Sequence, residues 1–388
     1  TRSAFWVRWR LENASAQARR TVVDLGNPRE DFVHWHVVRG DGRVEDSLIG
    51  DRVPFAQRTV PTRTLAHLIE LAPHERVDLY VRLASHDGLF EPMPVRFAER
   101  LAFIDVVERE NLALMLFHGG IIALGLYNLL LFVATRERAF GLYVLYLASF
   151  VLWSLTSRGF SLQYLWPTGP AFTNNHLVVA AAAVFACIGC FADAYLNLRH
   201  TAPPRVRRVL HAAIASNALV LLPIAANRYA LGAMVGWVTG LAVGLLTIGT
   251  AVWLLRRGSR QARFYVIAFS VLLVGTAGYI LSVAKVLPPS VFTTWGVQIG
   301  SAIEVLLLAL GLADSMNMLK LQKLEAEQRE RLAQQALAQR VEHEVAERTQ
   351  ALEAANQRLR ALSITDELTA AFNRRHFKQV CDGALVKR

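Results

Sequence analysis

The sequence has 388 residues, 53% of them hydrophobic, and a formal net charge of +11 at pH 7. This apolar share, with a mean hydropathy of +0.30, excludes an ordinary soluble chain and indicates membrane-spanning segments. The positive charge could indicate a nucleic-acid partner. Much of the arginine, however, lies in short loops between apolar runs, where basic residues orient membrane proteins. We therefore expect membrane lipid as a partner and no nucleic acid.

The first part of the chain shows the alternation typical of β-strands. Apolar residues recur at every second position in 5–11, 33–37 and 77–83. Two turn signals separate such runs, Gly40-Asp-Gly42 and His86-Asp-Gly88. Since residues 1–109 contain no cysteine, this pattern predicts a β-sandwich that holds together without disulfides.

Aromatic and histidine side chains on these strands are candidates for a ligand face. We expect this face to be lined by Trp6, His34, Trp35 and His36. Aromatic rings stack on sugars and other flat surfaces, although ordinary packing would also account for these residues. His34 and His36 have a spacing that a metal ion would accept, but no third ligand follows from the sequence, and we predict no metal site.

The central part of the chain holds apolar runs of the length that spans a membrane. About 20 mostly apolar residues cross about 30 Å of hydrocarbon as a helix. Seven runs meet this requirement: 112–134, 139–157, 176–196, 209–226, 230–255, 264–284 and 291–313.

Basic residues in the loops predict the orientation of these spans. The odd-numbered loops contain ten arginines: Arg136, Arg138, Arg199, Arg205, Arg207, Arg208, Arg256, Arg257, Arg260 and Arg263. The even-numbered loops contain three basic residues: Arg158, Arg228 and Lys285. Because positive loops stay in the cytoplasm, we expect a periplasmic N-terminus, a cytoplasmic C-terminus and a bacterial inner-membrane location.

One ionisable residue is predicted to lie within a span. Glu304 falls near the middle of 291–313, and a carboxyl group in hydrocarbon is costly enough to be a functional candidate. A structural hydrogen bond to a neighbouring helix is an equally good explanation.

A charged helical segment with partial heptads follows the last span. Val345, Leu352 and Leu359 repeat every seven residues. The second seam position is filled by Val341, Ala355 and Leu362 and interrupted by Arg348. Upstream, steps of four residues resemble a stutter. The pattern predicts a parallel homodimeric coiled coil with a weak seam, and the alternative is a solvated connecting helix.

Two stretches carry a resemblance to a known receptor family. The first contains Gly50-Asp-Arg-Val-Pro-Phe-Ala-Gln-Arg58 and Leu79-Tyr-Val-Arg-Leu83, and the second contains Gly125-Leu-Tyr-Asn-Leu-Leu-Leu-Phe132 and Arg136-Glu-Arg138. They resemble the outer domain and the first two helices of bacterial seven-transmembrane receptors with diverse intracellular signalling modules. The resemblance implies a small, carbohydrate-like periplasmic ligand.

The last residues carry a second resemblance. Asp366-Glu-Leu-Thr-Ala-Ala-Phe-Asn-Arg-Arg375 is similar to the opening of a GGDEF diguanylate cyclase domain, with Ala370 and Ala371 replacing a Gly-Leu pair. The signature positions are Asp366, Leu368, Thr369, Asn373, Arg374 and Arg375. The resemblance implies GTP and Mg²⁺ for an intact output domain. The chain reaches only Arg388, ahead of the expected metal-binding carboxylates, so we expect it to be inert by itself, with no catalytic residue and no cofactor.

The expected architecture is a multi-domain membrane protein in four parts. These are a periplasmic all-β sandwich (1–109), a seven-helix bundle (110–315), a coiled-coil signalling helix (316–364) and the start of an α/β output domain (365–388). The expected function is to relay a periplasmic ligand signal to cyclic di-GMP synthesis. The alternative is a receptor whose degenerate output domain acts through partner binding.

Overall fold

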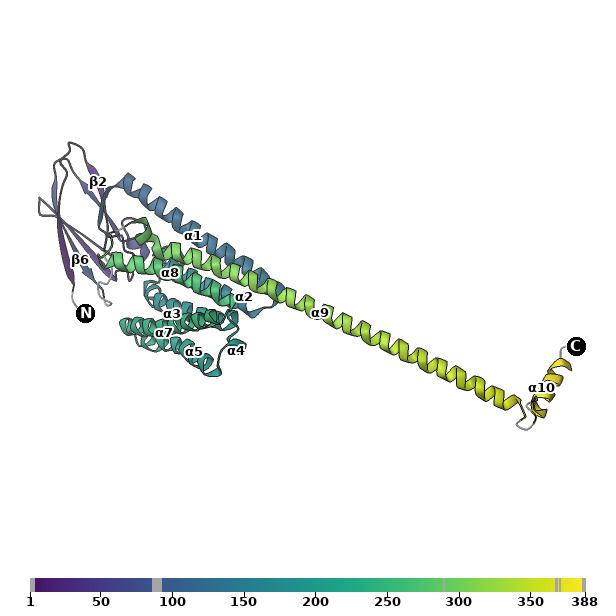
Figure 1. The fold of residues 1–388 in the computed structure, drawn as a ribbon. Helices are drawn as coiled ribbons and strands as arrows, with labels where there is room; N and C mark the ends of the chain where they lie inside the picture. Colours follow the sequence, from purple (N-terminus) through teal and green to yellow (C-terminus); the bar gives the residue numbers. More distant parts are fainter. Residues whose placement is uncertain (1–3, 86–92, 289, 367–368, 370, 386–388) are drawn as a thin grey trace. The chain divides into compact units, whose positions relative to one another are not determined.

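The computed structural model describes residues 4–85, 93–288, 290–366, 369 and 371–385. The turn signal at 86–88 and the signature residue Leu368 lie outside the described residues. The described chain divides into two units, Thr1–Ser315 and Met316–Arg388, and each is presented by itself (Figure 1).

The N-terminal part of the first unit is a sandwich of two antiparallel sheets. Its strands are β1 (Phe5–Glu12), β2 (Arg19–Asp24), β3 (Phe32–Arg39), β4 (Val44–Ile49), β5 (Ala66–Leu71), β6 (Arg76–Ala84) and β7 (Arg96–Glu99), with a short helix η1 (Phe55–Gln57). One sheet has the order β1-β6-β3-β4 and the other the order β5-β2-β7. The predicted β-sandwich is therefore confirmed.

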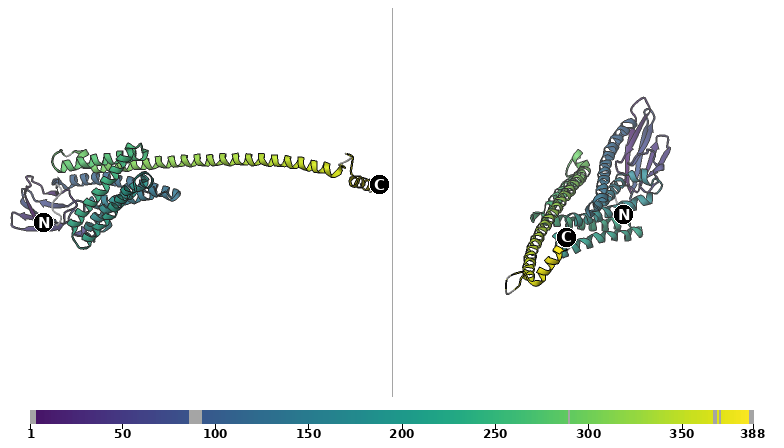
Figure 2. Two further views of the ribbon diagram at one scale, coloured as in Figure 1. Left: turned by 60° about the horizontal axis from the view of Figure 1, so that its bottom comes forward. Right: turned by 90° about the vertical axis from the view of Figure 1, so that its right-hand side faces the viewer.

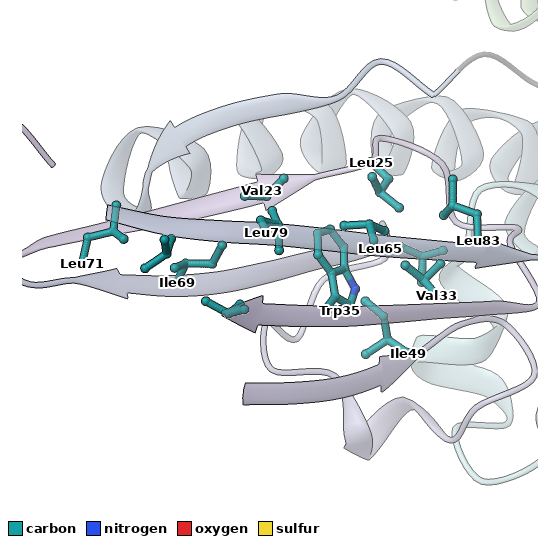
Figure 3. Packing of buried hydrophobic residues seen from close by; sticks show 13 residues of the cluster. Val23, Leu25, Val33, Trp35, Ile49, Leu65, Ile69, Leu71, Leu79 and Leu83 are labelled. Carbon is teal, nitrogen blue, oxygen red and sulfur yellow. The ribbon is translucent and has the colours of Figure 1, made fainter. Parts of the chain in front are cut away.

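The alternating apolar residues of the strands meet between the two sheets. Val33, Trp35 and Val37 of β3 are completely buried, as are Leu79 and Val81 of β6 (Figure 3). Burying a side chain of this size contributes about 1.5–3 kcal/mol. The Gly40–Gly42 turn joins β3 to β4 as predicted, and Gly42 has a φ of +84°, which a residue without a Cβ adopts readily.

Helices make up the rest of the first unit. They are α1 (Arg100–Thr135), α2 (Arg138–Ser157), η2 (Ser161–Leu165), α3 (Pro170–Tyr195), α4 (Leu198–Thr201), α5 (Pro204–Ser216), η3 (Asn217–Val220), α6 (Leu221–Ala225), α7 (Tyr229–Arg256), α8 (Arg260–Val283) and the first part of α9 (Val291–Ile364). Within the described part of the chain, seven helical segments are long and apolar enough to cross a membrane, in agreement with the seven predicted runs.

The boundaries of the first and fourth spans differ from the prediction. Helix α1 begins at Arg100, so the last residues of the segment expected to be β are helical. Its 36 residues exceed the roughly 20 that hydrocarbon requires, and the extra turns carry charged side chains. The fourth span changes from α5 through the 3-10 turn η3 to α6 because Pro223 lacks an N–H and its ring crowds the carbonyl four residues earlier.

Helix α2 packs against both α1 and α3 (Figures 1 and 2). Helices α8 and α9 approach each other closely where Gly275 meets Gly296 and Gly300, since a Cβ at Gly275 would overlap the Gly296 carbonyl. Small residues at such crossings allow membrane helices to pack backbone to backbone.

The second unit contains the remainder of α9 and α10 (Arg374–Leu385), joined by a short bridge between Thr365 and Phe372. A helix is confirmed for the segment predicted to form a coil. Its dimeric state stays a prediction.

Candidate functional site

Rows of polar and aromatic side chains cross the outer face of the four-stranded sheet. In the register of the sheet, Trp6 of β1 lies opposite Arg82 of β6, and Arg82 lies opposite His34 of β3 on its other side. The next row along the strands pairs Tyr80 with both Arg8 and His36. Successive side chains of a strand point to opposite faces, so all of these residues lie on the side away from the core.

Three aromatic rings on this face stack in a row. Trp6 is 58% exposed. Its ring stacks on His36 at 5.6 Å and 22°, and His36 stacks on His34 at 6.2 Å and 13°. His36 Nδ1 lies 2.5 Å from a carboxylate oxygen of Asp46 on β4, which holds the ring in place. An exposed row of rings held in this way suits a ligand with a flat face of its own.

Trp35 does not belong to this surface, which corrects the prediction. It is 0% exposed and stacks on His67 at 5.2 Å inside the sandwich (Figure 3). The physical reason is the two-residue period: His34 and His36 point outward, so the residue between them must point into the core. Of the four predicted ligand-face residues, Trp6, His34 and His36 therefore lie together.

Among the described residues, some arginines on this face are paired with a carboxylate and one is not. Arg8 and Arg10 both donate to Asp78, at 2.8 and 3.1 Å, and these hydrogen bonds hold the pKa of that carboxyl below its usual value. Arg82 forms no ion pair within the part of the chain that the structure describes. Burial, followed by the nearby Arg82, lowers the pKa of His34, which favours the neutral form of this imidazole.

No group of three or more histidine, cysteine or acidic residues that could hold a metal ion occurs among the described residues.

A buried ionic network joins the sandwich to α1. Glu110 of α1 accepts hydrogen bonds from Arg63 Nη2 at 2.5 Å and from Arg96 Nη1 at 2.7 Å. Arg96 also donates to Asp24 at 2.8 Å, and Arg63 Nε donates to Asn111 at 2.9 Å. The Arg63 side chain is 6% exposed and that of Asp24 is 0% exposed. Burial lowers the pKa of Arg63, and Glu110 opposes this effect.

The same loop of the sandwich also contacts the connection between α2 and α3. A Cβ at Gly159 would clash with the carbonyl of Arg63, and the φ of Gly159 is +83°. The Arg63 guanidinium lies 5.8 Å from the Phe160 ring centre, and Phe55 N donates to Pro167 O at 3.0 Å. Arg63 therefore contacts α1 and the α2–α3 connection at once.

Within the bundle, Glu304 of α9 is completely buried, as the sequence predicted for a mid-span acid. The Tyr146 hydroxyl on α2 lies 3.1 and 3.0 Å from its two carboxylate oxygens. One turn earlier, the Tyr143 hydroxyl donates to the Val305 carbonyl at 2.5 Å. Both tyrosines thus attach α2 to α9, the helix that continues toward the C-terminus. Whether Glu304 is functional or structural stays a prediction.

The residues predicted to be an output signature have local structural roles in the second unit. Asp366 Oδ1 accepts hydrogen bonds from the backbone and side chain of Thr369, both at 3.2 Å. Asn373 Oδ1 accepts from His376 N at 2.9 Å and so caps the start of α10. Arg374 and Arg375 are the first two residues of that helix.

Sequence reasoning missed two groups of polar residues. The network of Arg63, Arg96 and Glu110 joins residues far apart in the chain, and no local pattern reveals it. His118 in α1 could have been noticed, because an ionisable residue within a span is a functional candidate by default. It is buried, and its Nε2 lies 2.9 Å from Ser154 Oγ of α2.

Comparison with known proteins bears on both parts of the first unit. Residues 110–315 match the family described as 7TM diverse intracellular signalling, and residues 1–95 match its extracellular domain, 7TMR-DISM extracellular 2. No curated protein matches the chain at the significance required. The family match covers more than half of the chain and coincides with the seven apolar helices. The chain therefore belongs to the 7TM diverse intracellular signalling family and is a multi-pass transmembrane signalling receptor.

Proposed function

We propose that the sandwich binds a small, carbohydrate-like ligand in the periplasm and that the bundle relays this event to a cytoplasmic diguanylate cyclase output. In an intact output domain GTP would be the substrate and Mg²⁺ the cofactor, giving cyclic di-GMP. Trp6, His34 and His36 would form the ligand face. The resemblance of residues 366–375 to the opening of a GGDEF domain supports the nature of the output.

The observation that carries this proposal is the extent of α9. One helix, Val291–Ile364, contains the seventh span, the Glu304 contact to α2 and the segment that leads to the output signature. A helix is stiff along its axis, so a shift or rotation at Glu304 can be passed along it without intermediate loops.

A parallel homodimer would complete the mechanism. Joining two GTP molecules requires two active sites that face each other, so the geometry of a dimer can control the output. In the single chain the seam residues Val345, Leu352 and Leu359 are 57%, 71% and 66% exposed, which leaves them available to a second copy. A solvated connecting helix is the alternative for this segment.

The proposed location is the bacterial inner membrane, with the N-terminus periplasmic and the C-terminus cytoplasmic. The excess of arginine in the odd-numbered loops supports this orientation. Alkaline phosphatase fused after residue 96 should be active, and a fluorescent protein fused after residue 320 should fluoresce. An inactive phosphatase fusion would contradict the orientation.

Joining a complete cyclase domain in register at Asp366 tests the proposed output. We expect cyclic di-GMP synthesis that depends on the attached bundle and α9, with the free cyclase domain as the matched control. If the attached receptor leaves the activity of the cyclase unchanged, the second candidate is favoured, in which the output domain is non-catalytic and acts by binding a partner. The departures at Ala370 and Ala371 from the usual signature concern only the local turn.

A further inference from the structure

Arg82 is a half-buried cation on the ligand face that no carboxylate of the described residues neutralises. The other two arginines of the central rows, Arg8 and Arg10, share Asp78. Asp46, the second aspartate of the face, is engaged by His36. The two aspartates therefore have partners other than Arg82, which leaves the positive charge of Arg82 without a paired carboxylate in the described part of the chain.

The neighbours of Arg82 are aromatic or neutral. Register places Trp6 on one side of it and His34 on the other, and Leu48 of β4 follows beyond His34. A guanidinium offers five N–H donors in a planar fork that matches the two oxygens of a carboxylate. Beside it, the Trp6 ring presents a flat apolar surface that is more than half exposed.

We propose that this face binds a small ring-shaped acid, a molecule whose carboxylate pairs with Arg82 while its ring stacks on Trp6. Acidic sugars and aromatic carboxylic acids share this chemistry. The inference rests on the proposed ligand face and specifies the class of molecule that the face accepts.

His34 adds a second donor to the same site. As a neutral imidazole it carries one N–H, and an anion held between Arg82 and His34 favours the doubly protonated ring. Arg82 on β6 and His36 on β3, the strand of His34 itself, oppose protonation of His34, whereas Asp46 on β4 favours it. Binding of an acid is therefore expected to take up a proton and to strengthen as the pH falls below neutral.

Calorimetry on the full chain in detergent micelles would test the proposal with three probes: glucuronate, glucose and benzoate. Glucuronate and glucose share a pyranose ring and differ in charge, whereas benzoate keeps the charge and changes the ring. We expect at least one acid to bind at least tenfold more tightly than glucose. A preference between glucuronate and benzoate distinguishes an acidic sugar from an aromatic acid.

Arg82→Gln should weaken binding of the preferred acid by roughly ten- to a hundredfold and leave glucose unchanged, because a hydrogen-bonded charge pair is lost. Arg76→Gln is the matched control, since Arg76 lies on the same strand and face but pairs with Glu12. Equal binding of glucose and both acids, or no binding of either acid, would overturn the proposal. If Trp6→Ala abolishes binding of glucose while Arg82→Gln leaves binding of the acids unchanged, the proposed ligand face is supported and the proposed preference for acids is wrong.

Discussion

The network at Glu110 allows a quantitative prediction about how the sandwich is held to the first membrane helix. Glu110→Gln keeps the shape of the side chain and removes the charge that Arg63 and Arg96 share. Arg96 retains its hydrogen bond to Asp24, whereas Arg63, 6% exposed, retains the amide oxygen of Asn111 and loses its hydrogen-bonded carboxylate. The substitution thus leaves one buried guanidinium without a carboxylate.

The magnitude follows from the burial of the partners. Removing one member of a fully buried ion pair costs about 3–5 kcal/mol, and an exposed pair is worth about 0–1 kcal/mol. The Glu110 side chain is 25% exposed, and glutamine still offers one acceptor oxygen, so we expect a loss of about 2 kcal/mol. For a domain of this size, that loss lowers the unfolding midpoint of the sandwich by about 8–16 °C.

Thermal unfolding of the full chain in detergent, followed by hydrogen exchange at the amides of β2 and β7, would measure this loss. Glu99→Gln is the matched control, because Glu99 and Arg19 form an exposed pair at 3.5 Å whose loss should cost less than about 0.5 kcal/mol. The variant carrying both Arg63→Gln and Glu110→Gln should lose less stability than the sum of the two single losses, because both substitutions remove the same ion pair. Equal midpoints for the Glu99 and Glu110 variants would refute the reasoning.

Three further predictions concern pH, the membrane acid and the coil. Burial lowers the pKa of His67 to about 4, below its usual value of about 6.5, so the unfolded chain binds the extra proton between these values. The free energy of unfolding should therefore fall by about 3 kcal/mol as the pH drops from 6.5 to 4. The substitution His67→Phe should remove this part of the acid sensitivity. The control His74→Gln, at an exposed position, should leave it in place. Glu304→Gln, measured in the receptor carrying a complete cyclase domain, should shift the basal output or the ligand response, because its contact with Tyr146 joins two helices; unchanged output at equal expression would make the residue structural. Single cysteines introduced along 337–362, in a background without Cys187, Cys190 and Cys381, should crosslink most at 345, 352 and 359, and uniformly low crosslinking would reject the parallel dimer.

The sequence by itself determined the elements and their faces. Seven apolar runs appear as seven membrane-length helices, because the hydrocarbon thickness imposes a length that composition reveals directly. The alternation in 33–37 predicted which residues of β3 enter the core. Our expectation of Trp35 on the ligand face was wrong because it departed from this period, which groups Trp35 with Val33 and Val37. The mid-span burial of Glu304 likewise follows from its position in an apolar run.

Only the tertiary structure decided which elements meet. The strand order β1-β6-β3-β4 brings Arg82 between Trp6 and His34, although these residues are far apart in the chain. The contact of Tyr146 with Glu304 and that of Arg63 with Glu110 arise in the same way. Local periodicity reports which face of an element is apolar, but pairing between distant elements depends on packing the whole chain, so the ligand face and the ionic network could not be derived from residue spacing.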